Sequence, residues 1–383
     1  MNDILKQKLD EIGLKVLEIL FPKSGINLSK FACIAADQYT QDVSYWDNVK
    51  KYIGDEPSTY NLIYPEAYLE VDKEKKDFDD ILGKKILDIR KNMDDYVDKG
   101  IYESIGECFI YIERKSHIKK RRGLLVAIDL EKYDYNVGAK SLIRATELTV
   151  KDRLIVRKKI RENASLDLPH ILVLINDKED KLFREIEKIK NDILYDFELM
   201  NGGGNIKGYK ITDDRDIERL ADILLELKKS ARDGLLYAVG DGNHSLAAAK
   251  DTYVKTGKGR YALVELVNIY DEGLSFYPIH RLIMGVEKDK FIKETGIDPY
   301  NHPPLQELQE ILDKFNYKID YIHGKEECEA LGKKDKNIAI TFDRFEVESL
   351  FDDVINHGSL CRKSFSMGEA KDKRYYLEAA KII

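Results

Sequence analysis

The sequence predicts an α+β protein, and three observations support that prediction. Short runs with the apolar alternation of β-strands recur along the chain, as in Gly106–Arg114. A second such run, Arg122–Leu130, follows closely enough to form a hairpin. Between the strand-like runs lie longer amphipathic segments with helical spacing, such as Asp214–Ser230. With 383 residues, 43% of them apolar, the chain is long enough for two or three domains with a substantial core.

The composition limits the kinds of molecule that the protein is expected to bind. The formal net charge is −7 and no long basic run occurs, so we expect no nucleic-acid partner. No run of about eighteen apolar residues occurs, and the charged N-terminal segment has no apolar signal core, so we expect a cytoplasmic protein without a membrane partner. A homo-oligomer is one option that the sequence leaves open. A structural zinc site is not expected, because no CxxC pair occurs among Cys33, Cys108, Cys328 and Cys361.

The first third of the chain mixes both kinds of element. Ile4–Leu20 has helical spacing, whereas Phe31–Ala36 is a short apolar run typical of a buried strand. The polar residues Asp37–Thr40 follow that strand and could form the rim of a pocket. Lys73–Lys99 is expected to be a long charged helix or a helix pair, interrupted near Gly83.

A cluster of arginines follows in the middle of the chain. Arg153, Arg157 and Arg161 are four residues apart and would share one face of a helix. Such a face suits phosphate or carboxylate. The alternative is a solvated helix face on which Asp152 and Glu162 pair with the arginines.

The stretch Leu235–Lys250 is the centre of the functional prediction. Its apolar start, Leu235–Val239, predicts a buried strand, and Leu246–Lys250 predicts a helix. A strand, a tight turn and a helix direct backbone N–H groups and the positive end of the helix to one point, where an anion can bind. The alternative is that the glycines and polar residues only make the turn and cap the helix. The turn residues expected to take part are Gly240, Asp241, Gly242, Asn243, His244 and Ser245.

Further basic groups are expected at the same site. His280 and Arg281 end a strand-like run, although a turn with a surface histidine would give the same pattern. We expect Arg144, Arg153 and His280 to point toward Asp241, because polar groups beside strand ends tend to gather at sites. The basic residues predicted to bind phosphate are Arg144, Arg153, His280, Arg281 and Lys363. After Lys363 the chain ends in a predicted aromatic, basic helix.

Several of these segments together resemble one family. The blocks IRATE…T…DR, VGDGNHSLAAAK, GLSFYPIHR and RKSFSMGEAKDKRYYLE are similar to successive blocks of the domain-of-unknown-function family number 1015 (DUF 1015). FACIAADQYT and STYNLIYPEAYL are similar to its N-terminal blocks. The resemblance spans nearly the whole chain.

The turn itself resembles a second motif. Residues 241–245 are similar to the Asp-Gly-His-His-Arg motif of the ParB/sulfiredoxin-like fold, which free-serine kinases carry and use to cradle nucleotide phosphates. In this chain Asn243 stands at the first histidine and Ser245 at the arginine. The resemblance implies that Glu147 is the base toward a substrate hydroxyl. Phosphoryl transfer also needs a metal held by a carboxylate and donors around the phosphate, which Asp241 and the helix terminus at His244 could supply.

Together these observations predict three regions: an N-terminal α+β region at 1–130, a ParB/sulfiredoxin-like core at 131–285 and a C-terminal α/β region at 286–383 that packs on the core. The predicted function is phosphoryl transfer that depends on Mg²⁺ and on ATP or ADP, with a small hydroxylated metabolite such as serine or phosphoserine. Two alternatives remain: a metal-dependent phosphatase of a small phosphomonoester, and a non-catalytic nucleotide-binding regulator. The catalytic residues would be Glu147, Asp241 and His244.

Overall fold

A computed structural model describes residues 1–116, 119–151 and 154–382. Helices and β-strands are interspersed along the chain, and the strands form several sheets. This confirms the predicted α+β class. Within the described residues, no helix is long and apolar enough to cross a membrane.

The chain divides into two compact units. The first consists of Met1–Ala145, Thr149–Leu274 and Glu369–Ile383, and the second of Thr146–Leu148 and Ser275–Gly368. The division differs from the three predicted regions, because strands from both sides of residue 130 share one sheet in the first unit.

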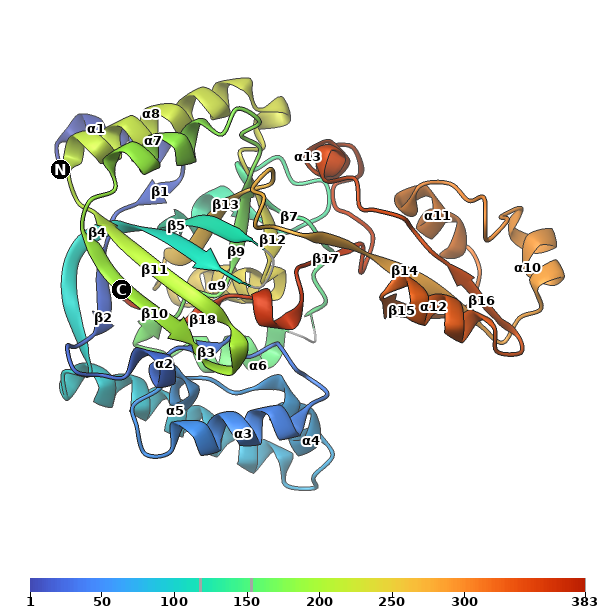
Figure 1. The fold of residues 1–383 in the computed structure, drawn as a ribbon, viewed down its shortest axis with the longest axis horizontal. Coiled ribbons are helices and arrows are strands. Elements are labelled where there is room, and N and C mark those ends of the chain that lie inside the picture. The colour runs from blue at the N-terminus through green and yellow to red at the C-terminus, as the bar shows by residue number, and fades with distance from the viewer. Residues whose placement is uncertain (117–118, 152–153, 383) are drawn as a thin grey trace. The chain divides into compact units, whose positions relative to one another are not determined.

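The first unit is built on a sheet that has 11 strands among the described residues (Figure 1). Its main path is β10-β11-β4-β5-β13-β9-β12-β7-β6, while β1 pairs with β5 and β2 with β4. The predicted hairpin is confirmed as the antiparallel pair β4 and β5. In chain order the strands are β1 (Leu14–Lys15), β2 (Leu17–Pro22), β4 (Tyr102–Lys115), β5 (Lys120–Asp129), β6 (Tyr133–Asp134), β7 (Ile143–Ala145), β9 (Leu172–Ile175), β10 (Ile193–Leu199), β11 (Gly204–Ile211), β12 (Tyr237–Asp241) and β13 (Tyr261–Asn268).

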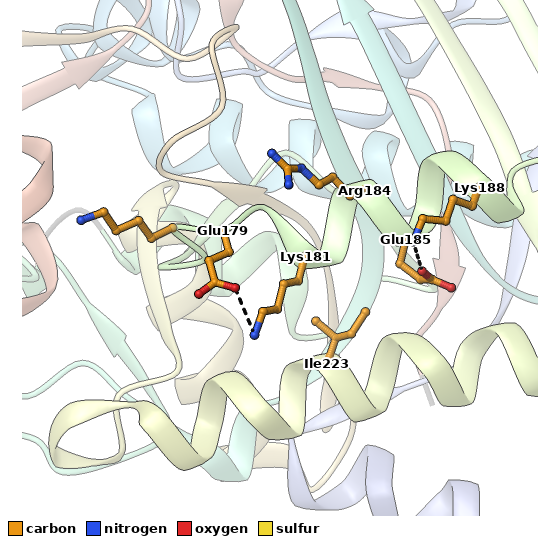
Figure 2. A pocket seen from close by; sticks show the side chains of 7 residues that line it. Glu179, Lys181, Arg184, Glu185, Lys188 and Ile223 are labelled. Atoms are coloured by element: carbon orange, nitrogen blue, oxygen red, sulfur yellow. Dashed lines mark hydrogen bonds and ion pairs between the residues drawn. The ribbon is translucent and has the colours of Figure 1, made fainter.

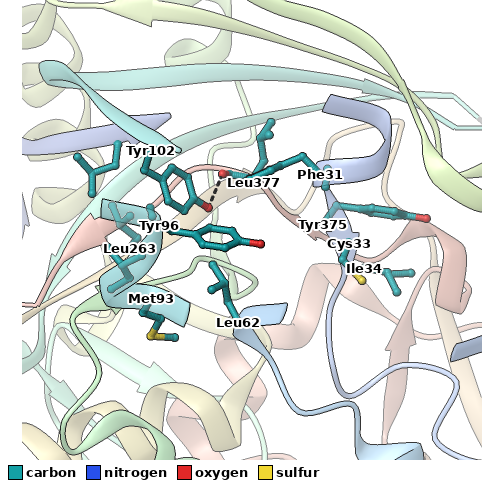
Figure 3. Packing of buried hydrophobic residues seen from close by; sticks show 14 of the residues in the cluster. Phe31, Cys33, Ile34, Leu62, Met93, Tyr96, Tyr102, Leu263, Tyr375 and Leu377 are labelled. Carbon is teal, nitrogen blue, oxygen red and sulfur yellow. Dashed lines mark hydrogen bonds between the residues drawn. The ribbon is translucent and has the colours of Figure 1, made fainter. Parts of the chain in front are cut away.

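Helices cover both faces of this sheet, because its strands alternate apolar side chains between two cores. Cys108, Ile110 and Ile112 of β4 lie in one core, as their alternation predicts, and Phe109 and Tyr111 lie in the other. The first core also takes in α2 to α5, and Figure 3 shows part of its packing. The second takes in α1, α7 and α8, which lie together in Figure 1. The helices are α1 (Asp3–Glu11), α2 (Leu28–Phe31), α3 (Val43–Ile53), α4 (Glu66–Lys73), α5 (Phe78–Asp98), α6 (Leu154–Arg161), α7 (Lys181–Ile189), α8 (Asp214–Ser230) and α9 (Asn243–Thr256).

Two helix predictions in the first third of the chain are wrong. The helix expected over Ile4–Leu20 ends at Glu11, because Gly13 adopts a left-handed conformation and the following residues pair with β4 and β5. Conversely, α5 continues through Gly83. A glycine inside a helix costs only about 1 kcal/mol, which the buried face of this long helix outweighs.

The end of the chain folds back onto the first unit as strands, and the helix predicted there is not formed. The aromatic pair Tyr375–Tyr376 forms β18, which pairs with β3 (Cys33–Ile34). Further on, β19 (Ala380–Lys381) pairs with β8 (Leu166–Asp167). Tertiary pairing thus decides the structure of a segment whose composition favours a helix.

The second unit has a smaller core around a sheet in which β14 (Phe276–Met284) is central. This strand pairs with β15 (Lys318–His323), β16 (Asn337–Ile340) and β17 (Phe365–Met367), all antiparallel. The helices of the unit are α10 (Lys288–Thr295), α11 (Leu305–Leu312), α12 (Lys325–Gly332) and α13 (Leu350–His357).

Candidate functional site

The predicted strand, turn and helix of the central stretch are confirmed. Strand β12 ends at Asp241, Gly242 is the N-cap residue, and α9 begins at Asn243. Gly242 has φ +82°, and a Cβ there would come within 2.9 Å of Ile171 Cγ1, so the turn requires glycine. The N–H groups of Ser245 and Leu246 both donate to the Gly242 carbonyl, which starts the helix tightly at this point.

The Asp241 carboxylate lies beside a cation that the sequence did not single out. Lys373 Nζ is 3.2 Å from Asp241 Oδ2, and only 6% of Lys373 is exposed. Both residues belong to the first unit. Lys373 lies in the C-terminal block KDKRYYLE, but nothing in the sequence indicated that this lysine would contact the turn.

A buried ionic network holds Lys373 in place through its neighbour Arg374. The Arg374 guanidinium pairs with Glu265 of β13 at 2.5 Å and with Glu378 at 2.6 Å, and all three side chains are buried. Gly123 of β5 makes room for this network, since a Cβ there would lie 2.2 Å from Glu265 Oε1. Buried charges of this kind tolerate little displacement, because each needs its partner.

The first turn of α9 also meets a histidine that the sequence analysis missed. His170 Nε2 lies 2.8 Å from Ser245 Oγ. His170 precedes β9 and begins the apolar run HILVLI, so no local pattern marked it as a site residue. The Tyr376 ring packs against the imidazole at 5.2 Å between centroids, with the planes tilted by 59°.

Asp37 and Arg157 also interact electrostatically with the residues around the turn. Burial raises the pKa of Asp37, but the charges of His170, Arg157 and Lys373 more than offset it, so the net pKa is lowered. Burial lowers the pKa of His170, against the opposing carboxylates of Asp37 and Asp241. Arg157 of α6 also forms an ion pair with Glu66. Asp37, the first polar residue after Phe31–Ala36, therefore interacts electrostatically with this cluster.

The side chains of the other turn residues contact backbone groups of neighbouring segments. The Asn243 side-chain amide donates to the Val239 carbonyl at 3.2 Å, and only 6% of this residue is exposed. His244 Nε2 accepts from the Val150 N–H at 3.3 Å. Gly240 lies within β12 itself. Their side chains and backbone thus shape the turn beside Asp241.

The Arg144 side chain is directed away from the turn. It is 2% exposed, and its guanidinium donates to the Asp233 carboxylate at 3.0 Å and to the Ser141 carbonyl at 2.9 Å. Asp233 precedes β12, whereas the turn follows it, so these contacts lie at the opposite end of the strand. Arg153 lies outside the described residues.

Four predicted residues belong to the second unit: Glu147, His280, Arg281 and Lys363. The Arg281 guanidinium is fully buried and donates to Gln309 and to the carbonyls of Arg362 and Lys363, at 2.8–3.0 Å. His280 is 2% exposed, and its Nδ1 accepts from the Phe342 N–H at 3.2 Å. Burial lowers its pKa. The Arg281 guanidinium and the His280 ring are therefore engaged with protein atoms, and Lys363 contributes its carbonyl to Arg281.

Glu147 is the fourth of these residues. It forms an isolated parallel bridge with Leu360, whose N–H donates to the Thr146 carbonyl at 2.8 Å. Burial chiefly raises the pKa of Cys361, and the Glu147 carboxylate adds to the effect. Glu147 therefore lies in electrostatic contact with Cys361 inside the second unit.

Asp241 was also the predicted metal ligand. Within the residues that the structure describes, no group of three or more His, Cys, Asp and Glu side chains is placed to hold a metal ion. Mg²⁺, however, is commonly bound by one or two carboxylates together with substrate phosphates and water. Asp241, which pairs with Lys373, would therefore hold Mg²⁺ only as one such shared ligand and not as part of a dedicated protein cage.

A surface cavity of about 610 Å³ lies elsewhere on the first unit (Figure 2). Many of its charges pair with each other, since Lys181 lies 3.3 Å from Glu179, and Lys188 lies 2.9 Å from Glu185. It is lined by Lys178, Glu179, Lys181, Arg184, Glu185, Lys188 and Ile223, and not by residues of the turn. We therefore base the candidate site on the turn and its neighbours.

Comparison with known proteins gives one family. A family model described as "Protein of unknown function (DUF1015)" matches residues 20–379. No curated protein matches the chain.

Among solved structures the likenesses are distant. A conserved hypothetical protein from Pyrococcus furiosus has 13% identity and a TM-score of 0.34, over 67% of this chain and 94% of that one. A free serine kinase in complex with AMP has 12% identity and a TM-score of 0.36, over 67% and 91%. SbnI with a C-terminal truncation, from Staphylococcus aureus, has 11% identity and a TM-score of 0.35, over 64% and 82%.

Proposed function

We propose that this chain, which belongs to the DUF1015 family, binds the phosphates of ATP or ADP at the turn between β12 and α9 and transfers a phosphoryl group to or from a small hydroxylated metabolite such as serine. The observation that carries the proposal is the Asp241–Lys373 pair, 3.2 Å apart, at the start of a helix. It puts a cation and a carboxylate beside the positive end of α9.

These groups match what phosphoryl transfer needs. The reaction depends on positioning and on neutralising the charge that builds up on the phosphate oxygens. Lys373 supplies a cation to a turn in which Ser245 stands where the resembling motif has arginine. Mg²⁺ bound with the nucleotide would neutralise further phosphate charge, and Asp241 is the residue that would hold it. The proposal does not draw on Arg144, His280 or Arg281, whose polar groups are engaged with protein atoms.

We keep Glu147 as the proposed base toward the acceptor hydroxyl. A carboxylate can accept the proton that the hydroxyl loses as its oxygen attacks phosphorus. This assignment rests on the resemblance and on chemistry.

The direct test is to supply ATP or ADP with Mg²⁺ and a panel of small alcohols and phosphomonoesters, and to follow the products by phosphorus NMR. Consumption of nucleotide only when an acceptor is present supports the kinase. Free phosphate released from a phosphomonoester without nucleotide would instead indicate the phosphatase. Nucleotide binding without turnover would indicate the regulator.

A Glu147→Gln variant tests the base. The change keeps size and hydrogen bonding but removes the proton acceptor, so the single-turnover rate should fall by roughly 10²–10⁴-fold. Nucleotide affinity should change little, because the base faces the acceptor. Glu348→Gln, an exposed glutamate of the second unit, is the matched control and should leave the rate unchanged. An unchanged rate in Glu147→Gln would end its role as base.

A further inference from the structure

The contact between His170 and Ser245 joins two groups that serve together in nucleophilic catalysis. Nε2 and Oγ are 2.8 Å apart, within hydrogen-bonding reach of a base and the hydroxyl that it activates. The two residues come from different parts of the first unit: one precedes β9, and the other lies in the first turn of α9. Because the two residues are far apart in the sequence, the contact forms only in the folded chain.

The surroundings hold the imidazole in place. The Tyr376 ring packs against it, and the Tyr376 hydroxyl accepts from the Ala36 N–H at 3.3 Å. Among the described residues Nδ1 has no hydrogen-bond partner, whereas Nε2 lies beside Ser245 Oγ. The tautomer with its proton on Nδ1 leaves Nε2 free to accept the serine proton.

The charges nearby suit a base that is neutral at rest. Burial lowers the pKa of His170, which favours the neutral ring that a general base requires. The carboxylates of Asp37 and Asp241 act in the opposite direction and would stabilise the imidazolium as it forms. Lys373 at Asp241 adds a cation for an incoming phosphoryl group.

We infer that Ser245 is a nucleophile that accepts a phosphoryl group, with His170 as its general base. The inference rests on the proposed function for its donor, a nucleoside triphosphate. Ser245 Oγ would form a bond to the γ-phosphorus while the bond from that phosphorus to the bridging oxygen breaks. The electron pair leaves with the nucleoside diphosphate, and the serine proton moves to His170 Nε2. The product is phosphoserine at position 245, from which an acceptor alcohol could take the group in a second displacement.

A fluorophosphonate probe tests the nucleophile without any nucleotide. Attack by Ser245 Oγ forms the bond to phosphorus, fluoride leaves, and the proton again goes to His170. The full chain should be labelled at Ser245, as located by peptide mass spectrometry. Ser245→Ala should not be labelled there, and His170→Gln should react roughly 10²–10⁴-fold more slowly, the usual contribution of a positioned base.

Ser230→Ala is the matched control, since its hydroxyl lies at the exposed end of α8 and bonds only to backbone among the contacts described. It should be labelled at Ser245 at the wild-type rate. A wild-type chain that is not labelled at Ser245, or His170→Gln labelled as fast as wild type, would overturn the inference. The first of these outcomes needs no variant and so does not depend on how a variant folds.

Separate measurements distinguish this inference from the proposed function. With ATP and Mg²⁺, phosphoserine at position 245 supports both. If the probe labels a chain that binds no nucleotide, the result supports Ser245 as the nucleophile with His170 as its base and contradicts the proposed function. Turnover of nucleotide at the wild-type rate by Ser245→Ala supports the proposed function and overturns the covalent step.

Discussion

The β12–α9 turn of the first unit and the His280–Arg281 pair of the second carry similar polar groups and use them differently. At the turn, Asp241, Lys373, His170 and Ser245 come from separate elements and contact one another through side chains. In the second unit, Arg281 bonds chiefly to backbone carbonyls of a loop and is fully buried. The first arrangement suits the ligand binding proposed above, whereas a guanidinium whose donors are engaged with its own loop serves stability.

Arg281→Met should give the largest effect and would sharpen this comparison. It removes the hydrogen bonds that the buried guanidinium donates to Gln309 and to the carbonyls of Arg362 and Lys363, and a hydrogen bond to a charged group contributes about 1.5–3 kcal/mol. We expect the free energy of unfolding to fall by at least about 2 kcal/mol in chemical denaturation. Arg344→Met, an exposed arginine of the same unit, should stay within about 0.5 kcal/mol of wild type. Unchanged stability with weaker nucleotide binding would instead make Arg281 a ligand residue.

Lys373→Met should act on ligand binding. A hydrogen bond to a charged group contributes about 1.5–3 kcal/mol, so affinity for ATP should fall roughly 10- to 100-fold by calorimetric titration. Lys371→Met removes the same charge two residues away, where the lysine pairs with Glu369 at the surface, and should bind nearly as wild type. Equal losses in both variants would show that general charge, and not the site, attracts the nucleotide.

Asp241→Asn should have a smaller effect that depends on magnesium. The Asp241–Lys373 pair is partly exposed at its carboxylate, so its loss should cost no more than about 1 kcal/mol of stability. Turnover should fall but be partly recovered at high Mg²⁺ concentration, because a ligand shared with phosphates is weakened and not removed. Asp196→Asn, which breaks a surface pair with Lys207, is the control and should need no added Mg²⁺. A loss that Mg²⁺ does not change would remove Asp241 from metal binding.

The smallest expected effect is a shift in a pH profile. Fluorophosphonate labelling of Ser245 should be constant at high pH and fall as His170 becomes protonated. Because burial lowers its pKa, the fall should lie below the ordinary histidine value of about 6.5. The charged groups acting on the ring are Asp37 and Asp241, which raise its pKa, and Arg157, which lowers it.

Asp37→Asn checks the assignment of that profile. It removes a carboxylate that raises the His170 pKa, so the fall should move to still lower pH. Asp196→Asn should not move it. An inflection at or above about pH 6.5 in the wild-type chain would show that His170 does not control the reaction.

The sequence alone determined the local elements that depend on nearby residues. The helix predicted at Asp214–Ser230 has those bounds, and the strand, turn and helix around Gly242 form where the pattern placed them. The predictions of these elements are correct because hydrophobic periodicity and glycine conformation depend on only a few neighbouring residues. The family, too, follows from ordered blocks along the chain.

Tertiary structure decided which polar groups meet. Lys373 reaches Asp241 because the last residues of the chain return as β18 and a buried Arg374–Glu265 pair fixes them, although their composition favoured a helix. His170 reaches Ser245 because β9 and β12 are neighbours in the sheet, a pairing that no local pattern encodes. Conversely, Arg144 looked available in the sequence, but the fold supplies Asp233 as its partner. A side chain's partners are set by contacts between distant segments, and those depend on how the whole core packs.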